Sequence, residues 1–274
     1  MKVLVTGATG FIGGNLAREL WRRGDDVRAL VRPGSNRLTI ENTGIVPIEG
    51  DILDRQSVDR AVQGCEAVFH VAAAYTFWSR DPAGVSRTNV AGTLNVLEAA
   101  RQAGVSRTVY TSTVGTVALV KDGLGDEDTP LDPKSLHGHY KRSKLQAERE
   151  ALALAAAGMP LVVVNPTAPV GPWDVKPTPT GKMVLDFLRR KIPAYLKTGM
   201  NVVDVADVVE GHILALEKGK SGERYILGNR NVSLKEIFDI LSSQTGLSAP
   251  RIRAPYWLVV GAGYADRFIE GTIF

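Results

Sequence analysis

The sequence predicts an α/β protein with a doubly wound parallel sheet and a smaller C-terminal lobe. Three observations lead to this fold class. The chain opens on an apolar run, Lys2–Thr6, that breaks into closely spaced glycines. Short apolar runs then alternate with amphipathic stretches through the first 165 residues, which is typical of parallel strands joined by crossover helices. After residue 165 prolines become frequent and the alternation stops.

The first strand and its glycines carry the clearest functional signal. A helix to about Arg23 is expected directly after the glycines. Strand, glycine turn and helix in this order are typical of a Rossmann-type dinucleotide-binding unit, because glycines permit a tight turn, close approach of a pyrophosphate and close packing of helix on sheet. The first N–H groups of such a helix attract phosphates. The cofactor-binding residues expected here are Gly7, Thr9, Gly10, Phe11, Ile12 and Gly13.

The remaining elements of residues 1–165, the expected NAD(P)-binding domain, follow from the same alternation. Helices are expected over about 55–63, 84–102 and 140–157. Further strands are expected at Val27–Val31, Ile45–Glu49, Ala67–Val71, Arg107–Thr111 and Leu161–Val164.

Residues 166–274 are expected to form a substrate-binding lobe, partly interleaved with the first domain. Five prolines within residues 166–181 indicate an ordered loop rather than sheet. Helices over about 182–190 and 207–217 and a strand at Arg224–Leu227 are expected next. Ser233 and Glu236 have the spacing of a capping box, which predicts a helix to about Thr245.

Composition narrows the class of protein. The chain has 274 residues, 44% hydrophobic and 23% charged, with a net charge of +4, as in ordinary globular enzymes. Its basic residues are scattered, which argues against a nucleic-acid partner. The single cysteine, Cys65, excludes an internal disulfide and suits a reducing compartment. The apolar run Tyr256–Ala265 is too short for stable membrane insertion, and no leader is recognised at the N-terminus. We therefore expect a cytoplasmic enzyme with a small-molecule substrate.

A tyrosine and a lysine, Tyr140 and Lys144, form the second functional signal. On a helix, residues four apart share a face, so the ammonium group is expected beside the phenol. A nearby positive charge lowers a tyrosine pKa and makes the phenol a usable general acid or base. Such a pair also arises by chance in a chain with seven tyrosines. Its place before the last strand of the domain favours catalysis, because ligands bind at the carboxyl edge of open α/β sheets.

Hydroxyl side chains gather where the fifth strand leaves the sheet. Thr111, Ser112 and Thr113 follow one another there, and one of them is expected to bind the reacting oxygen beside Tyr140. Ser and Thr also favour strand ends for local backbone hydrogen bonds, so this signal alone is ambiguous. Because successive side chains of an extended strand point to opposite sides, Ser112 and Thr113 are expected to differ in direction.

These motifs together resemble the extended short-chain dehydrogenase/reductase superfamily, over essentially the whole chain. TGATGFIG at 6–13, TSTVGT at 111–116 and YKRSK at 140–144 stand in that family's order. The resemblance implies that Tyr140 is the acid/base, that Lys144 binds the nicotinamide ribose and tunes Tyr140, and that Thr113 orients the substrate oxygen. It also implies cofactor contacts from three further segments and from Thr111. Their residues are Asp51 and Ile52, then Ala72, Ala73 and Ala74, then Asn165 and Thr167.

A closer resemblance is to the hopanoid-associated sugar epimerases, which neighbour the dihydroflavonol reductase-like enzymes. FHVAA, GHYKRSK, NPTAPVGPWDVKPTPTG and GERYILG carry it. It implies a bacterial source and a polar, sugar-like or hopanoid-linked substrate. Members usually run further, so a C-terminal tail is expected to be missing. Asp204 and Ala206 stand where His and Asp are expected, which leaves the role of that junction open.

The end of the second strand bears on the choice of cofactor. NAD enzymes of this kind place an acidic residue there for the ribose hydroxyls, whereas this chain has Arg32. A guanidinium can pair with a 2′-phosphate, although Arg32 could equally be a solvated turn residue. The sequence therefore favours NADP, with NAD as the alternative.

Other side chains are weaker candidates. His70 is expected to be a packed histidine, and no metal site is expected at His137 and His139, which lack partner ligands. Phe77 and Trp78 could line the substrate pocket.

The expected reaction is hydride transfer at a carbonyl or hydroxyl carbon. An epimerase or dehydratase that recycles its cofactor in place, and a non-catalytic dinucleotide sensor, are the alternatives. Many relatives form homodimers, so a homodimer is possible here.

Overall fold

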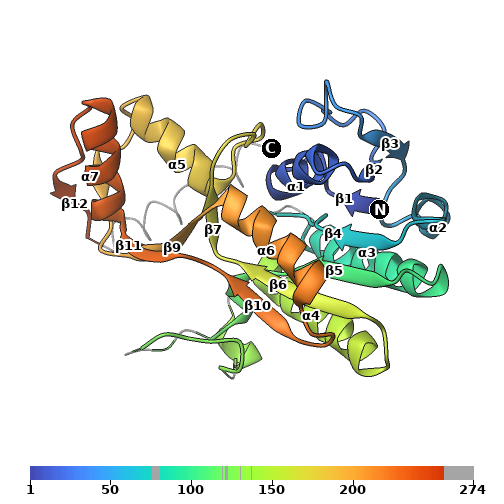
Figure 1. Ribbon diagram of the computed structural model, residues 1–274. Helices are drawn as coiled ribbons and strands as arrows, with labels where there is room; N and C mark the ends of the chain where they lie inside the picture. The colour runs from blue at the N-terminus through green and yellow to red at the C-terminus, as the bar shows by residue number, and fades with distance from the viewer. Residues whose placement is uncertain (76–80, 119, 121–122, 130, 137, 256–274) are drawn as a thin grey trace. The chain divides into compact units, whose positions relative to one another are not determined.

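The computed structural model describes residues 1–75, 81–118, 120, 123–129, 131–136 and 138–255, and Figure 1 shows its ribbon. The chain forms two compact units. The first comprises Met1–Lys176 and Val203–Gly228, and the second comprises Pro177–Val202 and Asn229–Phe274. Residues 203–228, expected in the C-terminal lobe, thus belong to the first unit. The binding roles expected for residues 1–165 and 166–274 stay predictions.

A seven-stranded sheet forms the centre of the first unit, in the order β10-β6-β5-β4-β1-β2-β3. Each pair of neighbouring strands is parallel, so the predicted α/β fold with a Rossmann-type parallel sheet is confirmed. The strands are β1 (Lys2–Thr6), β2 (Asp26–Val31), β3 (Val46–Glu49), β4 (Ala67–His70), β5 (Arg107–Thr111), β6 (Leu161–Pro166) and β10 (Arg224–Leu227).

Helices cover both faces of this sheet (Figure 1). On one face, Val3 and Val5 of β1 share a buried cluster with residues of α1 (Phe11–Arg22) and α6 (Val205–Lys218). On the other face, Leu4 shares a buried cluster with residues of three further helices of the first unit. These are α2 (Arg55–Val62), α3 (Pro82–Gln102) and α4 (His139–Ala156). Alternate residues of one strand therefore enter opposite core layers, as a sheet buried on both faces requires.

The strand expected at Arg224–Leu227 is observed as β10, which pairs in parallel with β6 at the edge of the main sheet. One expectation about residues 166–181 was wrong. The proline-rich run was expected to lack strands, whereas Ala168–Val170 forms the short strand β7. A proline cannot donate a backbone hydrogen bond, but its fixed φ is compatible with extended backbone, and Pro169 occupies such a position.

The second unit is smaller and less regular. Its helices are α5 (Pro179–Leu188) and α7 (Leu234–Thr245), and Phe187 and Phe238 stack between them with ring centroids 5.8 Å apart. The predicted capping box is confirmed, since Ser233 and Glu236 exchange side-chain and backbone hydrogen bonds. The strands are β8 (Ala194–Tyr195), β9 (Gly199–Asp204), β11 (Arg230–Ser233) and β12 (Ile252–Arg253). None of the helices in the described part of the chain has the length and apolarity needed to cross a membrane.

The close contact between the glycine turn and α1 leads to a first prediction. A Cβ atom on Gly13 would lie 2.3 Å from the carbonyl oxygen of Gly7, and this backbone atom cannot swing aside as a side chain could. We expect Gly13→Ala to lower the free energy of unfolding in urea by about 1–3 kcal/mol, the usual cost of overpacking. Gly10→Ala is the control, because its Cβ would meet the same oxygen only at 3.2 Å. Equal losses in both variants would contradict this explanation.

Candidate active site

The glycine turn forms one end of the candidate site. Gly7 has a φ of +79°, and a Cβ there would lie 2.7 Å from the Ala72 nitrogen. Gly10 precedes α1, and no side chain in the described part of the chain caps this helix. Gly10 is exposed and Thr9 and Ile12 are half-buried, whereas Phe11 belongs to the core. An uncapped helix start beside side-chain-free backbone fits the pyrophosphate of a dinucleotide.

Two segments expected to contact the adenosine end of the cofactor follow β2 and β3. Arg32 is exposed directly after β2, and its carbonyl oxygen accepts hydrogen bonds from Ser35. Arg37, in contrast, pairs with Glu49. Asp51 uses one carboxylate oxygen to accept the Leu53 N–H at 2.9 Å, and Ile52 is buried. The cofactor contacts of Arg32, Asp51 and Ile52 stay predictions.

The turn after β4 is held by a residue that the sequence did not reveal. Asn89 of α3 is buried, and its side chain accepts the Ala74 N–H at 2.7 Å and donates to Ser143 Oγ of α4 at 2.9 Å. Ser143 in turn donates to the Tyr140 carbonyl at 2.8 Å. Asn89 therefore connects the turn Ala72–Ala74, predicted to border the cofactor, to the helix that carries Tyr140. An asparagine on the apolar face of the predicted helix was the available signal.

Tyr140 and Thr113 come together at the carboxyl edge of the sheet. Tyr140 lies in the first turn of α4, is 8% exposed and contacts the Tyr75 ring edge-on, with centroids 5.0 Å apart. Burial raises the pKa of Tyr140 above its usual value, and a hydrogen bond with the Thr113 side chain partly offsets this. Thr113 is half-buried, whereas Ser112 Oγ is buried without a partner among the described residues. Because its pKa is raised, the Tyr140 phenol is neutral near pH 7.

The ammonium group of Lys144 binds to β5. Its ammonium group donates to Tyr110 Oη and to the Thr111 carbonyl, both at 2.8 Å, and the side chain is 1% exposed. Burial lowers the pKa of Lys144 to about 7, opposed by the charge of Glu148. In this structure the ammonium group therefore contacts β5 and not the Tyr140 phenol, and a role of Lys144 in lowering the pKa of Tyr140 stays a prediction. The long side chain reaches β5, where a phenol and a carbonyl satisfy its charge.

Tyr110 stacks on His70, with ring centroids 5.5 Å apart, and His70 is held by two buried hydroxyls. His70 Nδ1 lies 2.7 Å from Thr6 Oγ1, and Nε2 lies 2.9 Å from Thr93 Oγ1. Thr93 donates its hydroxyl hydrogen to the Asn89 carbonyl and therefore accepts from His70, which assigns the hydrogen to Nε2. Burial lowers the pKa of His70 to about 3. His70 is thus a neutral packed histidine, in line with its sequence context.

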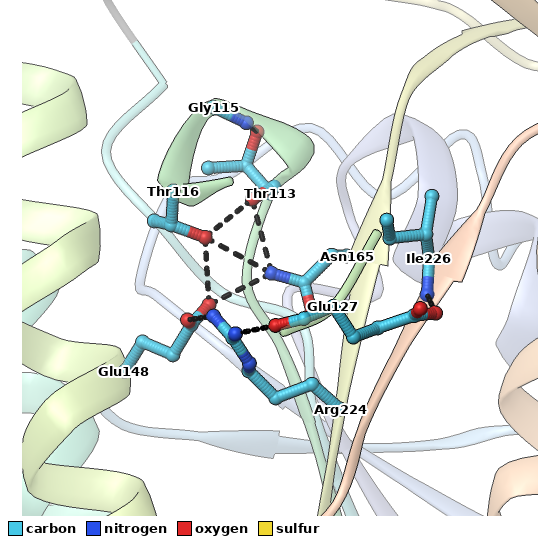
Figure 2. Close-up of polar contacts among 8 residues, drawn as sticks. All are labelled: Thr113, Gly115, Thr116, Glu127, Glu148, Asn165, Arg224 and Ile226. Atoms are coloured by element: carbon cyan, nitrogen blue, oxygen red, sulfur yellow. Dashed lines mark hydrogen bonds and ion pairs between the residues drawn. The ribbon is translucent and has the colours of Figure 1, made fainter. Parts of the chain in front are cut away.

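The side chains of Thr111 and Asn165 are engaged within the protein. Thr111 Oγ1 lies 2.8 Å from His212 Nε2 of α6. Asn165 is fully buried, and its amide donates to Glu148 Oε2 at 2.8 Å and to the Thr113 carbonyl at 3.1 Å, as Figure 2 shows. Thr167 Oγ1 is buried without a partner among the described residues. Their contacts with a cofactor stay predictions.

Several weaker candidates from the sequence remain, and only some of them lie among the described residues. Phe77, Trp78 and His137 lie outside the described residues. Asp204 caps α6 by accepting the Ala206 N–H at 2.8 Å, which gives this junction a structural role. Within the described ranges, no three His, Cys, Asp or Glu side chains lie close enough together to hold a metal ion.

The fold has a parallel sheet, a glycine turn between its first strand and first helix, and polar side chains at the carboxyl edge of the sheet. These features together define a dinucleotide-binding α/β enzyme. The chain belongs to the NAD dependent epimerase/dehydratase family, whose family model matches residues 3–228. A Synechocystis protein, provisionally named a dihydroflavonol 4-reductase, is 48% identical over 93% of this chain and 75% of its own length. The expected resemblance is therefore confirmed, and the reductase, epimerase and dehydratase names of relatives support enzymatic activity.

Solved structures share the fold. The crystal structure of gox2253 has a TM-score of 0.90 and 44% identity, and the match covers 98% of this chain and 82% of that one. The UDP-glucose 4-epimerase of Thermus thermophilus, solved in complex with NAD, has a TM-score of 0.78 and 26% identity. That match covers 96% of this chain and 93% of the epimerase.

The burial of Lys144 leads to a second prediction, on pH. Its pKa of about 7 in the folded chain lies below the usual 10.5, so between these values the unfolded chain binds the proton that the folded chain has lost. Lys144 therefore makes the fold more stable as pH rises through this window, by up to about 1.4 kcal/mol per pH unit. We expect Lys144→Met to remove this rise, measured by urea unfolding from pH 7 to 10. Lys141→Met, at a half-buried position on the same helix, should keep it, and an unchanged slope in Lys144→Met would contradict the prediction.

Proposed function

We propose that this protein is an NADP-dependent reductase that acts on a carbonyl carbon of a small polar substrate, sugar-like or hopanoid-linked. The observation that carries the proposal is the buried Tyr140 phenol in the first turn of α4, at the carboxyl edge of the sheet, where hydrogen bonding by the Thr113 side chain lowers its pKa and thereby offsets part of the effect of burial. Two hydroxyls side by side can both reach one substrate oxygen, which is the geometry that carbonyl activation needs.

The protonation of Tyr140 favours reduction over oxidation. Because burial raises its pKa, the phenol carries a proton to give to a substrate oxygen, while Thr113 holds that oxygen in place. A nicotinamide cofactor, when bound, would supply the hydride. Lys144, whose ammonium group is anchored on β5, would contribute positive charge beneath the site.

The names of relatives support reduction but leave epimerisation as the second candidate. The relative from Synechocystis is named a reductase, whereas the similar structure from Thermus is an epimerase. Both reactions involve hydride transfer, but a reductase consumes the reduced cofactor, whereas an epimerase first oxidises its substrate and then returns the hydride, so cofactor consumption and the product distinguish them. Val114–Val117, directly after the hydroxyls, contains no acidic pair of the kind a dehydratase generally uses.

Arg32 supports NADP rather than NAD. Its guanidinium is exposed after β2, and within the described residues it has no carboxylate partner, unlike that of Arg37. A 2′-phosphate would supply that partner, in a charge-assisted and often bidentate contact.

Removing the phenol hydroxyl tests the reductase. We expect Tyr140→Phe to bind NADPH as the wild type does and to lose at least about a hundredfold in kcat, because proton donation is absent. NADPH consumption with a panel of ketones, a dihydroflavonol among them, measures turnover, and product analysis separates reduction from epimerisation. Tyr225→Phe, on β10, is the matched control. Unchanged turnover in Tyr140→Phe would exclude the proposed acid, and a protein that binds NADPH without turnover on any substrate would be a sensor.

Removing the guanidinium tests the cofactor. We expect Arg32→Ala to weaken NADPH binding about tenfold or more through loss of a charge-assisted contact and to leave NADH binding unchanged. Fluorescence titration of both cofactors measures this. Arg37→Ala serves as the control, since its guanidinium already pairs with Glu49. Equal wild-type affinities for NADPH and NADH would overturn the preference.

A further inference from the structure

A buried carboxylate lies one helical turn beyond Lys144, and the chemistry proposed above does not use it. Glu148 is 1% exposed. Its Oε2 atom lies 2.8 Å from both Thr116 Oγ1 and Asn165 Nδ2, and its Oε1 atom accepts Arg224 Nη1 at 2.9 Å (Figure 2). A carboxylate taken out of water is costly unless such partners satisfy it, so its position is strongly determined.

The same polar groups hold the backbone that carries Thr113. Thr116 Oγ1 lies 2.7 Å from the Thr113 carbonyl oxygen, and Asn165 Nδ2 lies 3.1 Å from it. Thr116 has one hydroxyl hydrogen for two acceptors. Asn165 Nδ2 also lies 3.0 Å from Thr116 Oγ1, so the Glu148 carboxylate and the Thr113 carbonyl share the same two donors, Thr116 and Asn165. Because a carboxylate is a strong acceptor, replacing Glu148 would redistribute the hydrogen bonds that these two donors make to the turn after β5.

Arg224 anchors this carboxylate to the edge of the sheet. It lies on β10, its side chain is 22% exposed, and its other terminal nitrogen donates to the Glu127 carbonyl. Glu127 Oε1 accepts the Ile226 N–H at 2.7 Å, which satisfies a backbone donor of the edge strand. Figure 2 shows the contacts running from Thr113 through Glu148 and Arg224 to Glu127.

From this geometry we infer that Glu148, neutralised by Arg224, is a positioning residue for Thr113. It fixes the turn Val114–Thr116 and thereby orients the Thr113 hydroxyl toward the Tyr140 phenol. The catalytic meaning of this role rests on the proposed reductase, but the structural link to Tyr140 does not.

The structural link is tested without any substrate. In protein with ¹³C-labelled tyrosine, the NMR signal of Tyr140 is assigned by its loss in Tyr140→Phe. We expect Glu148→Gln to shift this signal in the same direction as Thr113→Val, and Glu150→Gln, two residues away on α4, to leave it in place. Thr116→Val keeps the Glu148–Arg224 pair and serves if Glu148→Gln does not fold. A folded Glu148→Gln or Thr116→Val protein with an unmoved Tyr140 signal overturns the inference.

A double-mutant cycle tests the catalytic consequence. We expect Glu148→Gln to lower kcat by about tenfold to a hundredfold, the usual effect of small misplacement, with little change in NADPH affinity. In the Thr113→Val background it should cost almost nothing more, because the group it positions is already absent. Equal losses in both backgrounds would show that Glu148 acts elsewhere, for example on Lys144. If no substrate is turned over, the proposed function fails, and the NMR result still decides the positioning role.

Discussion

Two fully buried ionisable side chains on α4, Lys144 and Glu148, are the constraint around which the carboxyl edge of the sheet is built. Each buried charge costs several kcal/mol unless partners compensate it. The partners of Lys144 lie at the end of β5, and those of Glu148 come from β6, β10 and the turn after β5. Satisfying two charges on one helix therefore ties the carboxyl ends of β5 and β6 to the first residue of β10, and the candidate site lies where β5 and β6 end.

This arrangement separates structural polar groups from reactive ones. The hydroxyls of Thr6, Thr93 and Thr111 form hydrogen bonds with buried histidines. The hydroxyl of Thr116 forms a hydrogen bond with Glu148. Thr113 Oγ1, in contrast, accepts the Gly115 N–H at 3.1 Å, and the Thr113 side chain lowers the pKa of the Tyr140 phenol at the sheet edge. Many hydroxyls gather at this edge, but burial and partners single out these two as able to meet a substrate oxygen.

The sequence predicted local features well and tertiary partners poorly. The strand Lys2–Thr6 and the capping box at Ser233 were found because apolar runs and cap spacing are written in neighbouring residues. The pairing of β10 with β6 was not predicted, because β6 precedes it by some sixty residues and no local pattern records that pairing. Helical spacing correctly put Lys144 on the face of Tyr140, but the direction of its ammonium group depended on Tyr110, a residue typical of a core strand. The sequence analysis did not single out Glu148 and Arg224, because their partners also lie far away along the chain.

The coordination of Lys144 has a further consequence for the site. An ammonium group carries three hydrogens, and the described residues supply two acceptors, Tyr110 Oη and the Thr111 carbonyl. The third hydrogen can serve a hydroxyl of a bound ligand without breaking either contact. Tyr110, which binds the ammonium group, also interacts with Thr93 of α3. Lys144 is therefore attached to a phenol that is itself fixed in the core, and it has little freedom to turn toward Tyr140. We therefore propose that Lys144 binds a ligand hydroxyl, and that a ligand bridging Lys144 and Tyr140 is the route by which the lysine charge reaches the phenol.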